Sequence, residues 1–111
     1  MKKLTREQNS MASELRWVTC GKYDGCFFNR GESPDFIILS AITRDLNTAG
    51  GCVVHARQAR AEFGLSEKDC NIERKEYKNI SFETGERYPV YIVNVILWKK
   101  EERWKDGSVL L

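Results

Sequence analysis

The sequence has 111 residues and is poor in the features that mark several broad classes of protein. It has two prolines and one histidine, and it contains no Gly-rich phosphate loop, internal repeat or low-complexity tract. No apolar run approaches the roughly 20 residues that a membrane-spanning helix needs. The N-terminal stretch MKKLTREQNS lacks the apolar core of a signal peptide. We therefore expect a cytoplasmic protein that does not act at a membrane.

Net charge is also small. Eighteen basic and sixteen acidic side chains leave a formal charge of +2, which gives no strong field toward nucleic acid. The small excess lies in residues 1–32, which hold six basic and four acidic groups. Tight binding to DNA is disfavoured on this ground.

The composition is that of a folded chain. Hydrophobic residues make up 41% and charged residues 31% of the sequence, which is typical of a globular protein and not of a disordered one. The length is that of one domain covering residues 1–111. Such a domain buries on the order of two-thirds of its unfolded surface, enough for a real core.

The N-terminal part predicts one helix. Thr5 followed by Gln8 resembles a capping box, and apolar residues then recur at helical spacing, so we expect a helix from about Thr5 into the mid-teens. Its end is open to two interpretations. Residues 15–28 are compatible with the end of the helix or with a hairpin, because LRWVTC also reads as a strand.

The central part predicts two helices. Ser33 is a suitable N-cap and Pro34 a suitable first helical residue. Five apolar residues then recur at spacings of three and four, as on one face of a helix: Ile38, Leu39, Ile42, Leu46 and Ala49. We expect helices over residues 34–48 and 52–63, joined by a turn at Gly50 and Gly51 and ended by Gly64. The alternative is a strand over the apolar run FIIL.

The C-terminal part predicts strands. Ser66 and Asp69 could cap a short helix across residues 67–77, but this segment is so charged that we expect a solvated face or a loop. KNISFET alternates, Gly85 supplies a turn, and PVYIVNVILW is a strand with two apolar faces. Such a strand is either central and covered on both sides or exposed as an interface on one. Residues 105–108 carry a second hairpin signal.

These elements predict an α+β fold with an N-terminal helix, a central helical hairpin and a C-terminal antiparallel sheet of two to four strands. This is the element order of a winged helix, with residues 84–88 as the wing. The similarity is one of element order, and no residue motif supports it.

Chemistry-bearing residues are sparse. Cys20, Cys26, Cys52 and His55 include pairs that suit zinc, but the C-x5-C spacing is longer than in common zinc motifs, so we expect no bound metal. Cys52 and His55 lie one helical turn apart, yet Cys52 falls on the apolar stripe of its helix, which disfavours a catalytic dyad. We therefore expect a non-enzymatic protein with no catalytic residue and no cofactor.

Two functions remain for a small binding or regulatory protein. The first is nucleic-acid (DNA) binding through the winged-helix-like helix pair, where phosphate contacts would add to base contacts; its candidate residues are Arg57, Gln58, Arg60, Lys78 and Arg87, with Lys22 and Lys99 as further phosphate contacts. The second is a protein–protein interaction module, such as an inhibitor or adaptor, that uses the aromatic C-terminal strands; its candidates are Tyr91, Trp98, Arg103 and Trp104. Balanced charge favours the second and the helix pair favours the first.

Overall fold

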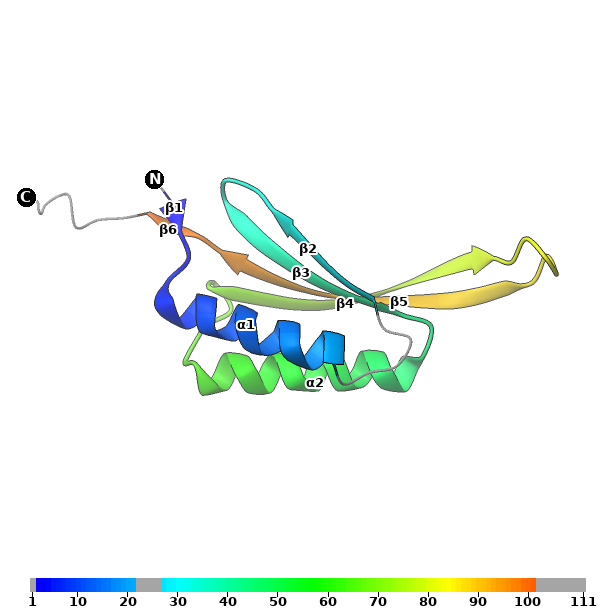
Figure 1. The fold of residues 1–111 in the computed structure, drawn as a ribbon, viewed down its shortest axis with the longest axis horizontal. Helices are drawn as coiled ribbons and strands as arrows, with labels where there is room; N and C mark the ends of the chain where they lie inside the picture. Colours follow the sequence, from blue (N-terminus) through cyan, green and yellow to red (C-terminus); the bar gives the residue numbers. More distant parts are fainter. Residues whose placement is uncertain (1, 22–26, 102–111) are drawn as a thin grey trace, which may run out of the picture.

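The structure is a computed structural model that describes residues 2–21 and 27–101; for residues 16–21 it describes the backbone. A four-stranded antiparallel sheet carries two helices on one face, and a small two-stranded sheet joins the two ends of the described chain (Figure 1). The elements in chain order are β1 (Lys2–Lys3), α1 (Arg6–Gly21), β2 (Phe27–Glu32), β3 (Phe36–Thr43), α2 (Leu46–Glu62), β4 (Cys70–Ile80), β5 (Arg87–Trp98) and β6 (Lys100–Glu101).

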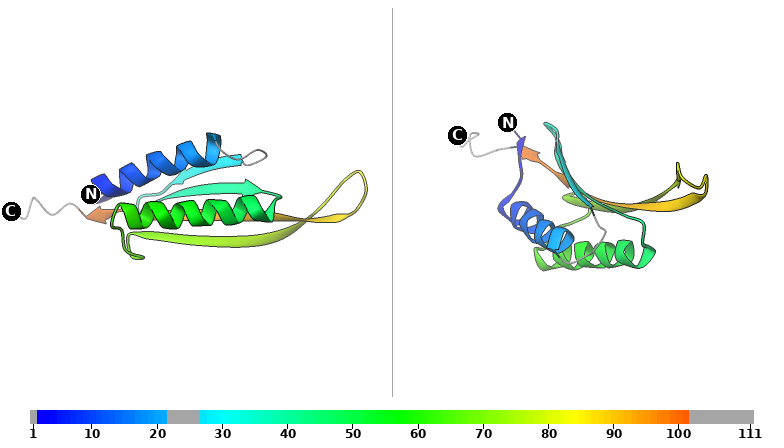
Figure 2. Two further views of the ribbon diagram at one scale, coloured as in Figure 1. Left: turned by 90° about the horizontal axis from the view of Figure 1, so that it is seen from below. Right: turned by 45° about the vertical axis from the view of Figure 1, so that its right-hand side comes forward.

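The sheet is built from two hairpins, β2–β3 and β4–β5, in the order β2-β3-β5-β4. α2 connects the hairpins, and α1 lies beside α2 on the same side of the sheet (Figure 2). The predicted α+β class is consistent with this architecture, but the winged-helix order is wrong. One helix and two strands, in place of a helical hairpin, occupy the centre of the chain.

The largest correction concerns residues 34–48, predicted as a helix. Residues 36–43 form β3, which pairs with β2 along one edge and with β5 along the other. The run FIILSAIT is apolar on both faces of a strand, so it satisfies the helical spacing as well as the alternating one. Ser33 does cap a local structure, but its Oγ accepts from the backbone N–H groups of Asp35 and Phe36 in a turn that leads into the strand.

α2 also differs from the prediction, because it runs through Gly50 and Gly51 without a break. Its N-cap is Asp45, whose carboxylate accepts from the N–H groups of Asn47 and Thr48 (both 3.3 Å). The helix buries Ala49, Cys52, Ala56 and Ala59 against the sheet and α1. Burial of this stripe outweighs the roughly 1 kcal/mol that each helical glycine costs relative to alanine.

The end of α2 is as predicted. Gly64 adopts a positive φ of 66°, and the Leu65 N–H donates back to the Arg60 carbonyl (3.0 Å). These are the marks of a helix closed by a glycine in the left-handed region. Residues 67–77 are neither the loop expected there nor the short helix considered as the other possibility: Ser66 and Asp69 form a hydrogen-bonded turn, and β4 begins at Cys70.

α1 confirms the predicted N-terminal helix and its capping box. Thr5 N–H donates to Gln8 Oε1 (2.8 Å), and Gln8 N–H donates to Thr5 Oγ1 (3.1 Å). Gln8 is fully buried, and its Nε2 donates to the carbonyls of Asp69 (2.9 Å) and Trp98 (2.7 Å). One side chain therefore ties the start of α1 to the start of β4 and the end of β5. The helical alternative for residues 15–21 holds; residues 22–26 lie outside the described residues.

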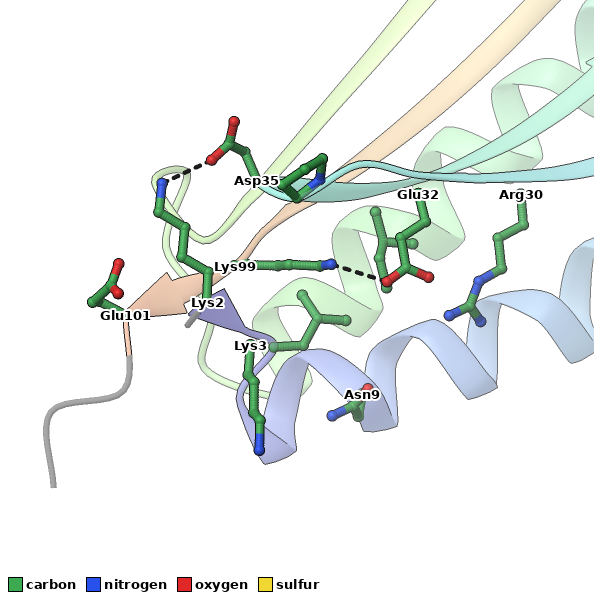
Figure 3. A pocket seen from close by; sticks show the side chains of 11 residues that line it. Lys2, Lys3, Asn9, Arg30, Glu32, Asp35, Lys99 and Glu101 are labelled. Atoms are coloured by element: carbon green, nitrogen blue, oxygen red, sulfur yellow. Dashed lines mark hydrogen bonds and ion pairs between the residues drawn. The ribbon is translucent and has the colours of Figure 1, made fainter. Parts of the chain in front are cut away.

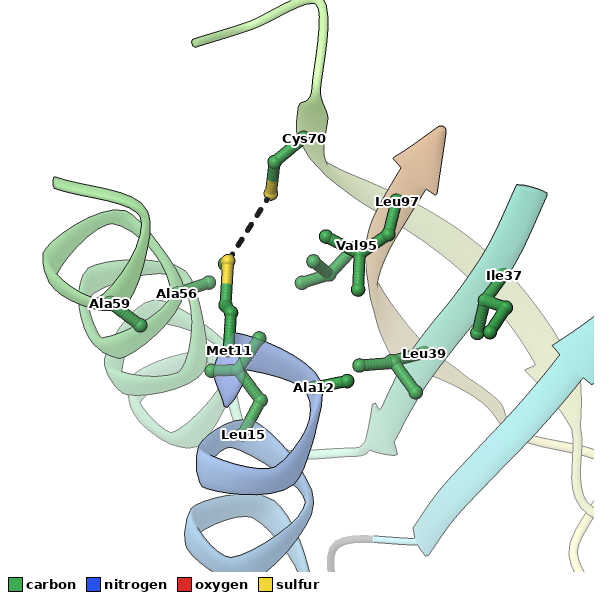
Figure 4. Close-up of a cluster of buried hydrophobic side chains, with 10 residues drawn as sticks. All are labelled: Met11, Ala12, Leu15, Ile37, Leu39, Ala56, Ala59, Cys70, Val95 and Leu97. Atoms are coloured by element: carbon green, nitrogen blue, oxygen red, sulfur yellow. Dashed lines mark hydrogen bonds between the residues drawn. The ribbon is translucent and has the colours of Figure 1, made fainter. Parts of the chain in front are cut away.

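The core lies between the helices and the helix-side face of the sheet (Figure 4). It is formed by small side chains of α2, by Met11 and Leu15 of α1, and by alternate residues of β3 and β5. The Cys70 thiol donates to Met11 Sδ (3.6 Å) inside this cluster. Alternation in β3 and β5 thus sends one set of side chains into the core and leaves the other set on the far face.

The β4–β5 hairpin extends beyond the rest of the sheet. β3 pairs with β5 only as far as Thr43–Tyr91, whereas β4 and β5 continue to pair up to Ile80–Arg87. Residues 77–90 therefore form a two-stranded arm that projects past the start of α2 (Figure 1). Gly85 has a φ of 73° in its turn, as predicted. No helix in the described part of the chain is long and apolar enough to span a membrane.

Candidate functional site

The four-stranded sheet has a second face that neither helix covers, which we name the open face. The strands bend so that this face lies on the inside of the curve (Figure 2, right). Its central apolar side chains come from alternate positions of β3 and β5, where directly paired residues share a face: Phe36, Ile38 and Ile42 from β3, and Val90, Ile92, Ile96 and Trp98 from β5. All of them are half-buried or exposed.

An aromatic pair marks one end of the open face. Phe36 and Trp98 are opposite each other across β3 and β5, with ring centroids 5.2 Å apart in an edge-to-face arrangement of 66°. The Trp98 side chain remains 38% exposed. A large ring that is fixed on one side by a second ring and open on the other can anchor a partner at little entropic cost.

A polar stripe crosses the middle of the open face. Ser40 Oγ donates to Asn94 Oδ1 (2.7 Å), and Asn94 Nδ2 donates to Glu73 Oε2 (3.0 Å). Lys75 forms an ion pair with the same carboxylate (3.6 Å). The stripe satisfies its own hydrogen bonds within the sheet, so its polar groups retain these partners when another surface covers them and excludes water.

At the base of the arm lies a hollow of about 530 Å³, which we name the arm hollow. Its apolar wall is formed by Phe27, Ile42, Tyr88 and Val90. The guanidinium of Arg44 stacks on the Tyr88 ring, 3.8 Å from the centroid, and adds a cation to this wall. Thr43, Asp45 and Asn79 complete the lining. A hollow with one apolar wall and several polar groups beside it is suited to an apolar anchor from a partner.

A third candidate is a charged cleft of about 880 Å³ between α1, the β1–β6 pair and the start of β3 (Figure 3). Two ion pairs lie in it, Lys2–Asp35 (2.8 Å) and Lys99–Glu32 (2.9 Å). Hydrogen bonds from the lysines lower the pKa of Asp35 and of Glu32, and the bond to Asp35 raises the pKa of Lys2.

The charges in this cleft keep both carboxyl groups ionised at neutral pH, which does not suit a general acid. No histidine or cysteine is among the lining residues. The arrangement instead holds the ends of the described chain to the β2–β3 hairpin, because Lys99 N–H also donates to the Asp35 carbonyl (2.8 Å).

The residues predicted to contact nucleic acid do not gather on one surface. Arg57 and Gln58 are exposed on α2, while Arg60 donates to the Cys70 carbonyl (3.2 Å) at the start of β4. Lys78 and Arg87 lie on the arm, where Lys78 pairs with Glu76 (3.3 Å). Lys78 is eight residues along β4 from Cys70, or roughly 26 Å at about 3.3 Å per residue. Lys22 lies outside the described residues.

The predicted protein-interface residues that the structure describes lie on opposite faces of the sheet. Trp98 is on the open face, as expected for the second face of β5. Tyr91 is 8% exposed and points to the helix side, where it packs with Val93 and the small residues of α2. Arg103 and Trp104 lie outside the described residues.

Two of the cysteine and histidine candidates, Cys52 and His55, have described side chains. Cys52 is buried, His55 is half-buried, and no group of three possible metal ligands occurs among the described residues. The side chain of Cys20 and all of Cys26 lie outside them. Burial raises the pKa of the Cys70 thiol to about 11, which leaves it protonated at neutral pH.

Comparison with known proteins gives no relative: no family model, curated protein or solved structure matches this chain. The candidate site therefore stands on the geometry alone.

Sequence reasoning missed half of the open face. Phe36, Ile38 and Ile42 were assigned to a helix, and Arg44 and Phe27 were assigned no role. Alternation in FIILSAIT was the available signal, since Ile37, Leu39 and Ala41 face the core and the residues between them do not.

Proposed function

We propose that this protein is a non-enzymatic protein-interaction module that binds a protein partner through the open face. The observation that carries the proposal is the row of apolar side chains on β3 and β5 that no described element covers. An uncovered apolar sheet face of this kind is typical of an interaction site. The Phe36–Trp98 pair provides an aromatic anchor at one end, and the polar stripe can be covered by a partner without losing its hydrogen bonds.

The electrostatics favour a protein over nucleic acid. The net charge is +2. Two basic residues are placed on the open face: Lys75 is paired with Glu73, and Arg44 stacks on the Tyr88 ring. Duplex binding draws its affinity largely from phosphate neutralisation by unpaired basic groups. An apolar face with two basic side chains that already have partners in the chain suits a protein surface with apolar side chains at its centre.

Site-specific photo-crosslinking in the native cell tests this proposal. A photoreactive amino acid replaces Ile38 on the open face, and the matched control replaces Val54, which is 51% exposed on α2. We expect a crosslinked polypeptide from position 38, insensitive to nuclease, and none from position 54. Trp98→Ala in the Ile38-labelled chain should reduce the yield about tenfold or more, because a buried aromatic anchor is worth about 2 kcal/mol or more.

Two results would overturn the proposal. Equal yields at positions 38 and 54 would mean that capture is not specific to the open face. A nuclease-sensitive product at position 38 would indicate nucleic acid as the partner. Thermal unfolding of Trp98→Ala, measured in parallel, separates a lost contact from a lost fold.

A further inference from the structure

The tip of the arm carries an aromatic side chain with no role in the fold. Phe82 has a relative exposure of 105%, as much as in an extended peptide. Its neighbours in the described structure do not shield it, and Ile80 beside it is 58% exposed. Phe82 is an aromatic ring held in water at the end of a projecting hairpin. Burial of such a ring against another surface is favourable, because it removes apolar surface from water.

The same end of the molecule carries a place for such a ring. The arm hollow presents Phe27, Ile42, Tyr88 and Val90, and it lies on the open face. A second hollow, of about 440 Å³, is lined by Phe82 together with Tyr88 and Arg44. Phe82 therefore lies on the same side of the arm as the arm hollow.

Phe82 does not fill the arm hollow of its own chain. Its ring is fully exposed, and Phe82 is not among the residues that line the hollow. Backbone bonds from Ser81 N–H to the Glu86 carbonyl and from Gly85 N–H to the Ser81 carbonyl (both 2.9 Å) hold the tip in its turn. The occupant of the hollow therefore comes from another molecule.

Charge points to the tip of a second arm as that occupant. Glu83 and Glu86 place two carboxylates beside Phe82, and Arg44 places a guanidinium in the wall of the arm hollow. Asp45 also lines the hollow, but its carboxylate accepts from Asn47 N–H, Thr48 N–H and the Thr48 hydroxyl at the start of α2. A phenylalanine flanked by acidic groups thus matches a hollow with an apolar wall and the Arg44 cation, and both features belong to this chain.

We propose that two copies of this chain form a dimer in which Phe82 of each copy enters the arm hollow of the other. A two-fold axis between the arms makes both contacts at once, because in an isologous interface residue i meets j and j meets i. Glu83 or Glu86 then faces Arg44 of the other copy. The dimer uses the arm end of the open face and leaves the Phe36–Trp98 end for the partner proposed above.

Sedimentation equilibrium on the purified full chain tests the dimer. We expect wild type to dimerise with a micromolar dissociation constant and Phe82→Ser to weaken dimerisation at least about tenfold. Val54→Ser is the matched control, because Val54 is an exposed apolar residue on α2; its dissociation constant should equal that of wild type. Phe82 is too exposed for its replacement to unfold the chain.

A complementation experiment makes the test specific. Phe27 is 72% exposed, so Phe27→Asp spoils the arm hollow without removing a core residue. Each variant alone lacks both reciprocal contacts, whereas a mixture of Phe82→Ser with Phe27→Asp restores one. The mixture should therefore associate more tightly than either variant alone.

The dimer is overturned if wild type stays monomeric through high micromolar concentration, if Phe82→Ser dimerises like wild type, or if the mixture is no tighter than its components. None of these results bears on the proposed partner site. Crosslinking from position 38 in a Phe82→Ser chain reports on that site separately, so the failure of one proposal is distinguishable from the failure of the other.

Discussion

Replacing Gln8 should remove the side-chain hydrogen bonds that hold the start of α1 to the sheet. Its fully buried side chain makes three hydrogen bonds, two donated to the carbonyls of Asp69 and Trp98 and one accepted from Thr5 N–H. Gln8→Met keeps the length of the side chain and removes all three bonds. The Asp69 carbonyl keeps a bond from Trp98 N–H (3.0 Å), whereas the Trp98 carbonyl and Thr5 N–H lose the bonds described.

The size of the effect follows from these bonds. Each contributes about 1 kcal/mol net, and a buried group left without a partner costs about 1–3 kcal/mol. We expect Gln8→Met to lower the free energy of unfolding by roughly 3 kcal/mol. For a domain of this size this corresponds to a fall in Tm of roughly 12 °C, at about 4 °C per kcal/mol.

Urea unfolding followed by circular dichroism measures this change, with Ser10→Met as the control on the exposed side of α1. The control should stay within about 0.5 kcal/mol of wild type. A Gln8→Met variant that also stays within about 0.5 kcal/mol would refute the argument, because it would mean that the three bonds add no net stability.

A second variant at the same position adds a pH signature. In Gln8→Glu a carboxylate would face two carbonyl oxygens in a buried site, which raises its folded-state pKa above the unfolded value of about 4.3. A raised carboxyl pKa gives stability that is present below the unfolded pKa and lost as pH rises through the folded pKa. The deficit relative to wild type should therefore be larger at pH 7 than near pH 4. A deficit that is the same at both would contradict this account.

Three further predictions concern single residues. Burial raises the pKa of the Cys70 thiol to about 11, so Cys70 should resist a thiol reagent at about pH 8 in the native state and react on unfolding. Peptide mass mapping measures this labelling, and rapid labelling of the native protein would contradict the burial of Cys70. The pKa of Asp69 is lowered, chiefly by its hydrogen bond from Lys100, so the ionised carboxylate stabilises the fold above its unfolded pKa. The free energy of unfolding of wild type should therefore exceed that of Asp69→Asn by roughly 1 kcal/mol at neutral pH, and this difference should disappear as pH falls through the folded pKa. A pH-independent difference in urea midpoints would argue against the Asp69–Lys100 pair. Asp45→Ala should cost about 1 kcal/mol through the lost N-cap, measured by thermal unfolding, and an unchanged Tm would mean that the cap is replaceable.

Sequence reasoning succeeded where a signal was local. The Thr5–Gln8 box predicted the start of α1, Gly64 the end of α2 and Gly85 the arm turn, because each depends on a few neighbouring residues. The strand over residues 89–98 was also predicted, together with the choice between burial on both sides and an interface on one. The apolar second face of β5 was thus visible before the fold was known.

Tertiary structure decided what local patterns left ambiguous. Residues 36–43 are apolar at both the helical and the alternating spacing, so only pairing with β2 and β5 selects the strand. Gly50 and Gly51 read as a turn, yet burial of Ala49 and Cys52 keeps them helical. In β4, residues 70–77 are highly charged and show no apolar alternation, and their pairing with β5 makes them a strand.

Most of the candidate site is among the features that only the tertiary structure decided. By itself the sequence determined that β5 has two apolar faces and that Trp98 stands at its end. That Phe36, Ile38 and Ile42 share the outer face with it, and that Phe27, Tyr88 and Arg44 meet around one hollow, depends on the strand order β2-β3-β5-β4. The physical reason is that each of these contacts joins residues far apart in the chain, and only the register of the sheet brings them together.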